Sequence, residues 1–314
     1  MNDGPDQGEL IRRFAGNPIL RPEDFPGSVN AVFNPAATVF DGRTLMLVRI
    51  EHRTGLSSLA VATSDDGLTG WQIDPDRGLA PQPGNPDEHG GVEDPRITQI
   101  GDEYFVVYTG LSVNGPQVCL AKTRDFADWE RLGMMMRPDD KDAALFPVKF
   151  GDRWAMLHRP ATSKGSHIWL SFSPDLKHWG DSQVLLTARS GGWWDNHKIG
   201  LGPQPLLTKD GWLLCYHGVR KTAAGLIYRA GLALLDADDP AKVLARGDEW
   251  VLSPREPYER HGDVSDVVFP CGWIVRDDGD TVHIYYGAAD FVIAVAEASL
   301  EGMLAHLRQY RDAI

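Results

Sequence analysis

The chain has 314 residues and a hydrophobic content of 42%, so it is long enough to bury a large core. Its formal net charge of -13 argues against nucleic-acid binding, which needs a basic surface. A small anionic ligand is not excluded, because such a ligand responds to local charge. The three cysteines, Cys119, Cys215 and Cys271, have neither CxxC nor metal-type spacing, so we expect buried free thiols.

The first residues, MNDGPDQGELIRRF, contain no apolar signal segment, and no apolar run reaches the ~20 residues that span a membrane. We therefore expect a cytoplasmic protein with no membrane partner. Residues 1–16 are predicted to be an N-terminal tail, disordered over the acidic first eight, and residues 17–314 a single domain.

A unit that begins at an X-Pro dipeptide recurs five times along the chain. An apolar run follows each proline, then a Gly/Asp turn, then a second apolar run, a pattern that predicts β-hairpins. Polar turns that end in tryptophan follow the first three hairpins. The prolines are Pro35, Pro95, Pro147, Pro203 and Pro270, and the tryptophans are Trp71, Trp129 and Trp179.

Units of roughly 50 to 65 residues with three or four antiparallel strands have the size of propeller blades. We therefore predict an all-β fold, a five-bladed β-propeller. Two sandwiches of stacked hairpins are the alternative, but they would not explain five periods. The last stretch, from Ser299, has apolar residues at helical spacing behind a serine cap, which predicts a short C-terminal helix.

In a propeller, the innermost strands line a central channel, and the ends of those strands form the site. The ends of the predicted strands carry a recurrent set of polar residues. The set comprises Asn34, Arg49, Glu51, Glu93, Asp94, Arg96, Tyr108, His158, Arg159, Lys198, Tyr216, His217 and Asp290.

Asp94, in the segment GGVEDPR, is the first catalytic candidate. The proline after it favours an extended backbone at Asp94, and an acid in the mouth of a propeller can donate a proton if burial raises its pKa. The alternative is that Asp94 only ties down a turn.

Arg49, Arg159, Lys198 and His217 are cationic or can become so, and they lie at comparable positions in their units. Each taken alone fits a solvated surface base, but four together favour an anion pocket. The histidines show no metal-binding spacing, and there is no P-loop or GxSxG motif, so we expect no metal and no cofactor. Trp193 and Trp194 fit either a sugar-stacking platform or the core between blades.

Nine motifs along residues 17 to 300 resemble those of glycoside hydrolase family 130. They are NPIL at Asn17, VFNPA at Val32, LVRIE at Leu47, EDPRI at Glu93, LFPVK at Leu145, LHRP at Leu157, KIGLGPQP at Lys198, YHGV at Tyr216 and YYGAAD at Tyr285. The resemblance implies a five-bladed catalytic propeller that acts on β-mannosides with inversion.

The resemblance also assigns roles. It makes Asp94 the catalytic acid, whose proton passes through a mannosyl hydroxyl in some members. It assigns phosphate binding to Arg49, Arg159, Lys198 and His217, and sugar contacts to Asn34, Arg96, Asp290 and Tyr228.

Because all four phosphate-type residues are present, the resemblance favours an inverting phosphorylase. Such an enzyme cleaves a β-mannoside with inorganic phosphate, its co-substrate, to give α-mannose 1-phosphate. Phosphate is already an anionic nucleophile, so a cationic cradle replaces the second carboxylate of inverting hydrolases. A β-mannosidase of the same fold and a non-catalytic carbohydrate-binding propeller are the alternatives. The sequence leaves open the linkage, β-1,4 or β-1,2, the acceptor sugar, and the oligomeric state, a homo-oligomer included.

Overall fold

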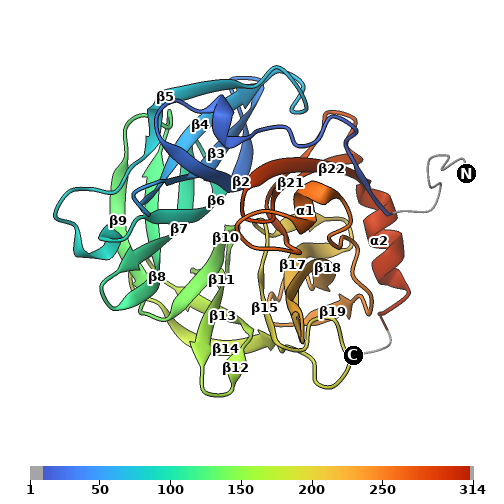
Figure 1. Ribbon diagram of the computed structural model, residues 1–314. Coiled ribbons are helices and arrows are strands. Elements are labelled where there is room, and N and C mark those ends of the chain that lie inside the picture. Colours follow the sequence, from blue (N-terminus) through green and yellow to red (C-terminus); the bar gives the residue numbers. More distant parts are fainter. Residues whose placement is uncertain (1–9, 312–314) are drawn as a thin grey trace, which may run out of the picture.

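Five antiparallel sheets stand around a common centre in the computed structural model, which describes residues 10–311 (Figure 1). Hydrogen-bonded neighbours follow chain order in four of the sheets, as in a propeller blade. The predicted five-bladed β-propeller is therefore confirmed. Pro35, Pro95, Pro147 and Pro270 lie within the innermost strands of their blades, and Pro203 follows the innermost strand of blade 4.

The strands of the five blades have the following bounds. Blade 1 contains β2 (Val29–Phe40), β3 (Arg43–His52), β4 (Ser57–Ser64) and β5 (Gln72–Leu79). Blade 2 contains β6 (Val92–Ile100), β7 (Glu103–Ser112), β8 (Gly115–Thr123) and β9 (Glu130–Met136). Blade 3 contains β10 (Asp140–Phe150), β11 (Arg153–Thr162), β12 (Gly165–Ser166), β13 (Ile168–Ser173) and β14 (Gly180–Leu186). Blade 4 contains β15 (Lys198–Leu201), β16 (Leu206–Thr208), β17 (Gly211–Thr222), β18 (Gly225–Leu235) and β19 (Val243–Arg246).

Blade 5 joins the two ends of the described chain. It contains β20 (Val268–Val275), β21 (Thr281–Ala288) and β22 (Val292–Ser299), and its outermost strand is β1 (Ile11–Arg13). Because β1 pairs antiparallel with β22, it closes the ring with hydrogen bonds. Residues 11–13 thus belong to the propeller, whereas the sequence predicts a tail over residues 1–16. The predicted disorder of the first eight residues lies outside the described part of the chain.

Helices are few and short. The predicted C-terminal helix is confirmed as α2 (Leu300–Arg308), and the Ser299 hydroxyl caps it by accepting from the Gly302 amide at 3.0 Å. The others are α1 (Pro257–Arg260) and the single 3-10 turns η1 (Pro22–Asp24) and η2 (Pro86–Glu88). Among residues 10–311, no helix is long and apolar enough to cross a membrane.

The core is divided into clusters that fill the spaces between neighbouring blades. Leu45 and Leu47 of blade 1, for example, pack with Val106 and Tyr108 of blade 2. The β-branched and aliphatic residues of each sheet alternate between its two faces, so each blade packs against both neighbours. Cys119, Cys215 and Cys271 are free and buried, as predicted.

Bulges in the innermost strands turn polar side chains towards the centre. Asn34, Asp94 and Asp142 have φ angles of 49°, 48° and 52°, and each lies where the register with the next strand shifts. Asn and Asp tolerate this left-handed backbone better than most residues do. The prediction of an extended backbone at Asp94 is therefore wrong.

Candidate active site

A polar pocket of about 110 Å³ lies among the inner strands, and every blade contributes to its wall. It contains eight of the nine residues to which the resemblance assigns roles, all except Arg96. The lining residues are Asn34, Arg49, Asp94, Lys141, Asp142, Arg159, Lys198, His217, Tyr228, Phe269 and Asp290.

The pairing of the first two strands explains why residues far apart in sequence meet here. Arg49 lies opposite Phe33, Arg159 opposite Lys141, and His217 opposite Gly200. These are corresponding positions in blades 1, 3 and 4, so the propeller symmetry brings three predicted residues to one level of the channel.

Asp94 occupies the acidic side of the pocket and is 4% exposed. Its Oδ1 accepts hydrogen bonds from Asn34 Nδ2 at 2.9 Å and from Arg49 Nη1 at 2.8 Å. Lys141 Nζ lies 4.0 Å from Oδ2. The carboxylate is thus held in one orientation by an amide and two cations.

The charges around Asp94 decide its protonation. Burial by itself raises the pKa of Asp94, but Arg49, Lys141 and Arg96 outweigh burial and lower this pKa to about 2. A pKa raised by burial, the condition for proton donation, is therefore not met by the arrangement of Asp94 alone. The carboxyl group whose pKa is raised, to about 6, is that of Asp290, because burial and then the nearby Asp94 charge disfavour its ionisation.

The guanidinium group of Arg49 binds the carboxylates on the acidic side of the pocket and does not join the other cationic residues. Its Nη1 donates to Asp94 at 2.8 Å, its Nη2 to Glu93 Oε1 at 2.8 Å, and its Nε to Ser57 Oγ at 3.2 Å. Every nitrogen of the guanidinium group thus has a protein acceptor. This geometry favours Arg49 as the support of Asp94 over its predicted role in phosphate binding.

The opposite side of the pocket is cationic. Arg159 donates through Nε and Nη2 to Asp142 Oδ2 at 3.0 and 2.8 Å, which leaves Nη1 without a hydrogen bond inside the described chain. Asp142 is fully buried, and although burial raises its pKa, the charges of Arg159 and its cationic neighbours hold this pKa far below the usual range. Asp142 therefore fixes the guanidinium group of Arg159 in place.

His217 is neutral in this arrangement. Burial first, and the charges of Arg159 and Lys198 after it, lower the pKa of His217 to about 3 against the opposing effect of Asp142. Its ring packs on Phe269 with the ring centres 4.4 Å apart, and its Nδ1 has no hydrogen-bond partner within residues 10–311. His217 is therefore an uncharged imidazole, whose Nε2 lies 3.6 Å from Asp142 Oδ2.

Lys198 and Lys141 complete the cationic side. Lys198 Nζ lies 5.1 Å from the centre of the Tyr228 ring, and no carboxylate of residues 10–311 forms an ion pair with it. Burial first, and the Arg159 charge second, lower the pKa of Lys198. Lys141 is only loosely paired, to Asp94 at 4.0 Å. The pocket thus joins a buried carboxylate to several incompletely neutralised cations.

The sequence matches the model of glycoside hydrolase family 130, described as beta-1,4-mannooligosaccharide phosphorylase, over residues 11–309. The chain belongs to glycoside hydrolase family 130. It is 36% identical over 299 residues to a 1,2-beta-oligomannan phosphorylase of Thermoanaerobacter sp. (strain X514), a match that covers 91% of this chain and 96% of the relative.

Two further proteins resemble this family 130 chain along nearly its whole length. A beta-1,4-mannooligosaccharide phosphorylase of Ruminococcus albus is 31% identical over 315 residues, with 97% of this chain and 93% of the relative covered. The structure of a beta-1,2-mannobiose phosphorylase from Listeria innocua in complex with beta-1,2-mannobiose superposes with a TM-score of 0.87 at 31% identity, covering 95% of this chain and 99% of that one. Phosphorylases named for both linkages are therefore among the relatives.

Arg96 is the predicted site residue of this family 130 chain that lies outside the pocket. It is fully buried, and its Nε and Nη2 donate to the carbonyl oxygens of Gly202 and Leu201, both at 2.9 Å. Its Nη1 donates to the Asp94 carbonyl oxygen at 2.8 Å. This position favours a link between the inner strands of blades 2 and 4 over the predicted sugar contact.

Sequence reasoning missed Lys141, Asp142 and Phe269. In blade 3 the bulge is at Asp142 and is followed by Ala143, so Ala143 and not Pro147 corresponds to Pro35 and Pro95. The run DKDAALF, an acid followed by a small and then an apolar segment, was the available signal.

Trp193 and Trp194, for which the sequence allows either a sugar-stacking platform or the core between blades, lie in different environments. Trp194 is 3% exposed and stacks on Tyr216 with the ring centres 5.6 Å apart, so it belongs to the core. Trp193 is exposed, and the Arg189 guanidinium group lies 4.0 Å from its ring.

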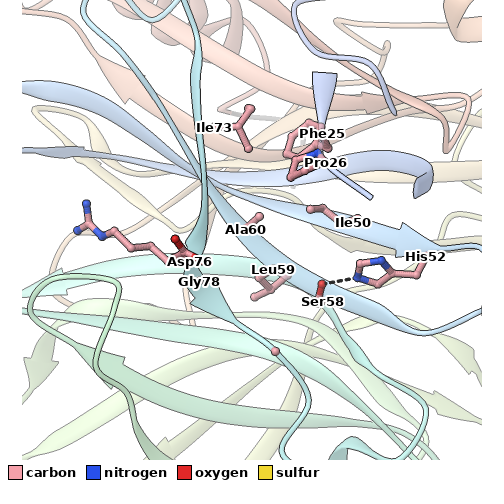
Figure 2. A pocket seen from close by; sticks show the side chains of 12 residues that line it. Phe25, Pro26, Ile50, His52, Ser58, Leu59, Ala60, Ile73, Asp76 and Gly78 are labelled. Carbon is pink, nitrogen blue, oxygen red and sulfur yellow. Dashed lines mark hydrogen bonds between the residues drawn. The ribbon is translucent and has the colours of Figure 1, made fainter. Parts of the chain in front are cut away.

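A second cavity, of about 250 Å³, lies on blade 1 (Figure 2). Its wall is largely apolar, with Phe25, Ile50 and Leu59 among the lining residues. His52 and Ser58, which are joined by a 2.9 Å hydrogen bond, lie apart from Asp76 in the view. This cavity lacks the convergent charges of the central pocket.

Proposed function

We propose that this protein is an inverting mannoside phosphorylase, a glycosyltransferase-type enzyme of class EC 2.4.1. Its substrates are a short β-mannoside oligosaccharide and inorganic phosphate, and it releases α-mannose 1-phosphate. Family membership and the named phosphorylase activities of its relatives support the proposal.

The observation that carries the proposal is Lys198. A partly buried ammonium group without a carboxylate partner in the described chain is costly unless an anion joins it. Arg159, which keeps one nitrogen available, and the uncharged ring of His217 line the same pocket. Together with Lys141 they fit a tetrahedral anion such as phosphate, which takes donors from several directions.

The reaction exchanges one bond at the anomeric carbon for another. A phosphate oxygen attacks this carbon from the face opposite the leaving sugar, so a new C1–O bond forms as the old one breaks, and the β linkage gives an α product. Asp94 gives a proton to the leaving oxygen, directly or through a mannosyl hydroxyl. Monohydrogen phosphate carries one proton into the reaction. The new phosphate ester releases this proton, which protonates Asp94 again.

The low pKa of Asp94 becomes compatible with this role when phosphate binds. The added negative charge near Lys141 and Arg49 offsets their effect on Asp94 and raises its pKa. The proton therefore becomes available when the nucleophile is in place.

The remaining pocket residues fit the mannosyl group. The amide of Asn34 and the carboxyl group of Asp290 can bond sugar hydroxyls, and the Tyr228 ring, which lies beside Lys198, can pack against the mannosyl ring. No cofactor is needed beyond phosphate as co-substrate.

A hydrolase of the same fold is the less favoured function. An inverting hydrolase needs a second carboxylate that activates water. Asp142 is bound to Arg159, and Glu93 is bound to Arg49, so neither is available as a free base. Asp290, the remaining carboxyl group of the pocket lining, is assigned here to the mannosyl group.

Synthesis in the reverse direction tests the proposal. The protein is incubated with α-mannose 1-phosphate and, separately, β-mannose 1-phosphate, each with mannose, glucose or N-acetylglucosamine as acceptor. We expect phosphate release and a β-mannoside from the α anomer alone, with the productive acceptor defining specificity. No phosphate release from either anomer with any of these acceptors or with mannobiose would contradict the proposal.

A further inference from the structure

Buried carboxylates clamp the connections that lead into the inner strands of blades 2, 4 and 5. Glu88, Asp195 and Glu259 are at most 1% exposed. Each accepts a hydrogen bond from a tyrosine hydroxyl on the second strand of its blade. The pairs are Tyr108 with Glu88 at 2.7 Å, Tyr216 with Asp195 at 3.1 Å and Tyr286 with Glu259 at 2.9 Å.

An arginine from the outermost strand of the same blade completes each cluster. Arg131 of β9 lies 2.9 Å from Glu88, Arg246 of β19 lies 2.8 Å from Asp195, and Arg13 of β1 lies 2.7 Å from Glu259. We call each set of carboxylate, tyrosine and arginine a carboxylate clamp. Blade 3 has a related contact, between Asp140 and His158 at 2.6 Å.

The clamps lie next to the pocket in a regular way. Tyr108, Tyr216 and Tyr286 directly precede Thr109, His217 and Gly287, the residues that correspond to Arg49 in strand pairing. Because side chains alternate along a strand, each tyrosine points to the opposite face from the residue that follows it, which in blade 4 is the pocket residue His217. Each clamp thus contacts the strand that pairs with the innermost strand of its blade.

The clamp of blade 4 holds the segment that delivers Lys198. Asp195 receives Arg189 Nε at 2.8 Å in addition to Arg246 and Tyr216, so both of its oxygens are bonded. The His197 amide then donates to the Val219 carbonyl oxygen at 2.9 Å, and Lys198 pairs with Val219. Only two residues separate the clamped carboxylate from Lys198.

The clamp of blade 2 precedes Asp94, with the five residues 89–93 between Glu88 and Asp94. Glu88 ends η2, and the Gly91 amide donates to the Glu88 carbonyl oxygen at 3.0 Å. Glu93 and Asp94 follow within β6. A fully bonded buried carboxylate resists displacement, because moving it would leave charged groups unpaired in the core.

We propose that Tyr216 and Asp195 are positioning residues for Lys198 in the phosphate site, and that Tyr108 and Glu88 are positioning residues for Asp94. The inference rests on the proposed phosphorylase function. It predicts that the two clamps control different kinetic constants, because one supports the nucleophile site and the other supports the acid.

Matched Tyr→Phe substitutions test the proposal, since each removes one hydroxyl and keeps the packed ring. We expect Tyr216→Phe to raise KM for phosphate on the order of tenfold while kcat stays within about twofold. We expect Tyr108→Phe to lower kcat on the order of tenfold while KM for phosphate stays within about twofold. The same parameter changing in both variants, or no change in a folded variant, would overturn the proposal.

Amide hydrogen exchange provides a readout that does not depend on the reaction. Exchange over residues 195–198 should become faster in Tyr216→Phe but not in Tyr108→Phe, which should instead affect residues 88–94. If wild-type turnover shows no phosphate dependence, the proposed function fails, and the exchange pattern still decides whether the clamps hold these segments. Equal exchange in both variants and the wild type would contradict the clamps.

Discussion

The ion pair between Arg49 and Asp94 joins blades 1 and 2 at the wall of the pocket, with Nη1 2.8 Å from Oδ1. The same guanidinium group reaches Glu93 at 2.8 Å, so one side chain orients two neighbouring acids. A forked contact of this kind needs the planar geometry of arginine. Arg49 therefore fixes the orientation of Asp94, the acid of the proposed mechanism.

Substitution Arg49→Lys tests this role. A lysine keeps the positive charge but cannot bond both carboxylates in a fixed geometry, so we expect kcat to fall about tenfold or more. Steady-state kinetics at varied phosphate should show a smaller change in KM for phosphate than in kcat. A rise in KM for phosphate with unchanged kcat would instead make Arg49 a direct phosphate ligand.

Substitution Asp94→Asn should abolish proton donation while preserving the shape of the side chain. We expect kcat to fall on the order of 10²- to 10⁴-fold, the range that general acid catalysis supplies. Titration calorimetry should show that affinity for the mannoside is retained. Turnover close to that of the wild type would remove Asp94 from the mechanism.

Substitution Lys198→Gln should weaken phosphate binding. Loss of a charge-assisted hydrogen bond costs about 1.5–3 kcal/mol, so we expect KM for phosphate to rise roughly 10- to 150-fold. The control is Lys149→Gln. Lys149 is exposed and lies on β10, the innermost strand of blade 3, and its Nζ is 5.2 Å from the centre of the Trp154 ring. Equal KM for phosphate in the two variants would contradict the cationic site.

Substitution Asp290→Asn should stabilise the fold while reducing activity. Burial and the Asp94 charge raise the pKa of Asp290 from 3.8 to about 6, so the folded state holds this proton more tightly than the unfolded state does. The associated stability is present below about pH 4 and is lost as the pH rises through 6, a difference of about 3 kcal/mol. Urea denaturation should therefore show the variant more stable at pH 7.5 and equal at pH 3.5. Equal stability at pH 7.5 would contradict the raised pKa.

The five blades could be predicted from the sequence because hairpin turns and proline positions are local sequence signals. The strand register of blade 3 could not be predicted in this way. Pro147 lies four residues after Ala143, the residue that corresponds to Pro35 and Pro95 in strand pairing. Because of this shift, Lys141 and Asp142 were not recognised as site residues from the sequence. Only the pairing of Lys141 with Arg159 shows that blade 3 contributes three pocket residues.

The charge states of the site depend on contacts that join different blades. The low pKa of Asp94 arises from Arg49 of blade 1 and Lys141 of blade 3 acting against burial. His217 was predicted as a potential cation, but burial first and the charges of Arg159 and Lys198 next keep it neutral. Sequence motifs identify these residues, but their protonation depends on burial and on charged residues of other blades, which only the folded structure shows.

Product analysis with and without inorganic phosphate, using β-1,2-mannobiose, β-1,4-mannobiose and β-1,4-mannosyl-glucose, shows directly whether the protein is a phosphorylase. We expect α-mannose 1-phosphate from at least one of these substrates, formed only when phosphate is present. Free mannose released at equal rates with and without phosphate would contradict this expectation and would identify a hydrolase.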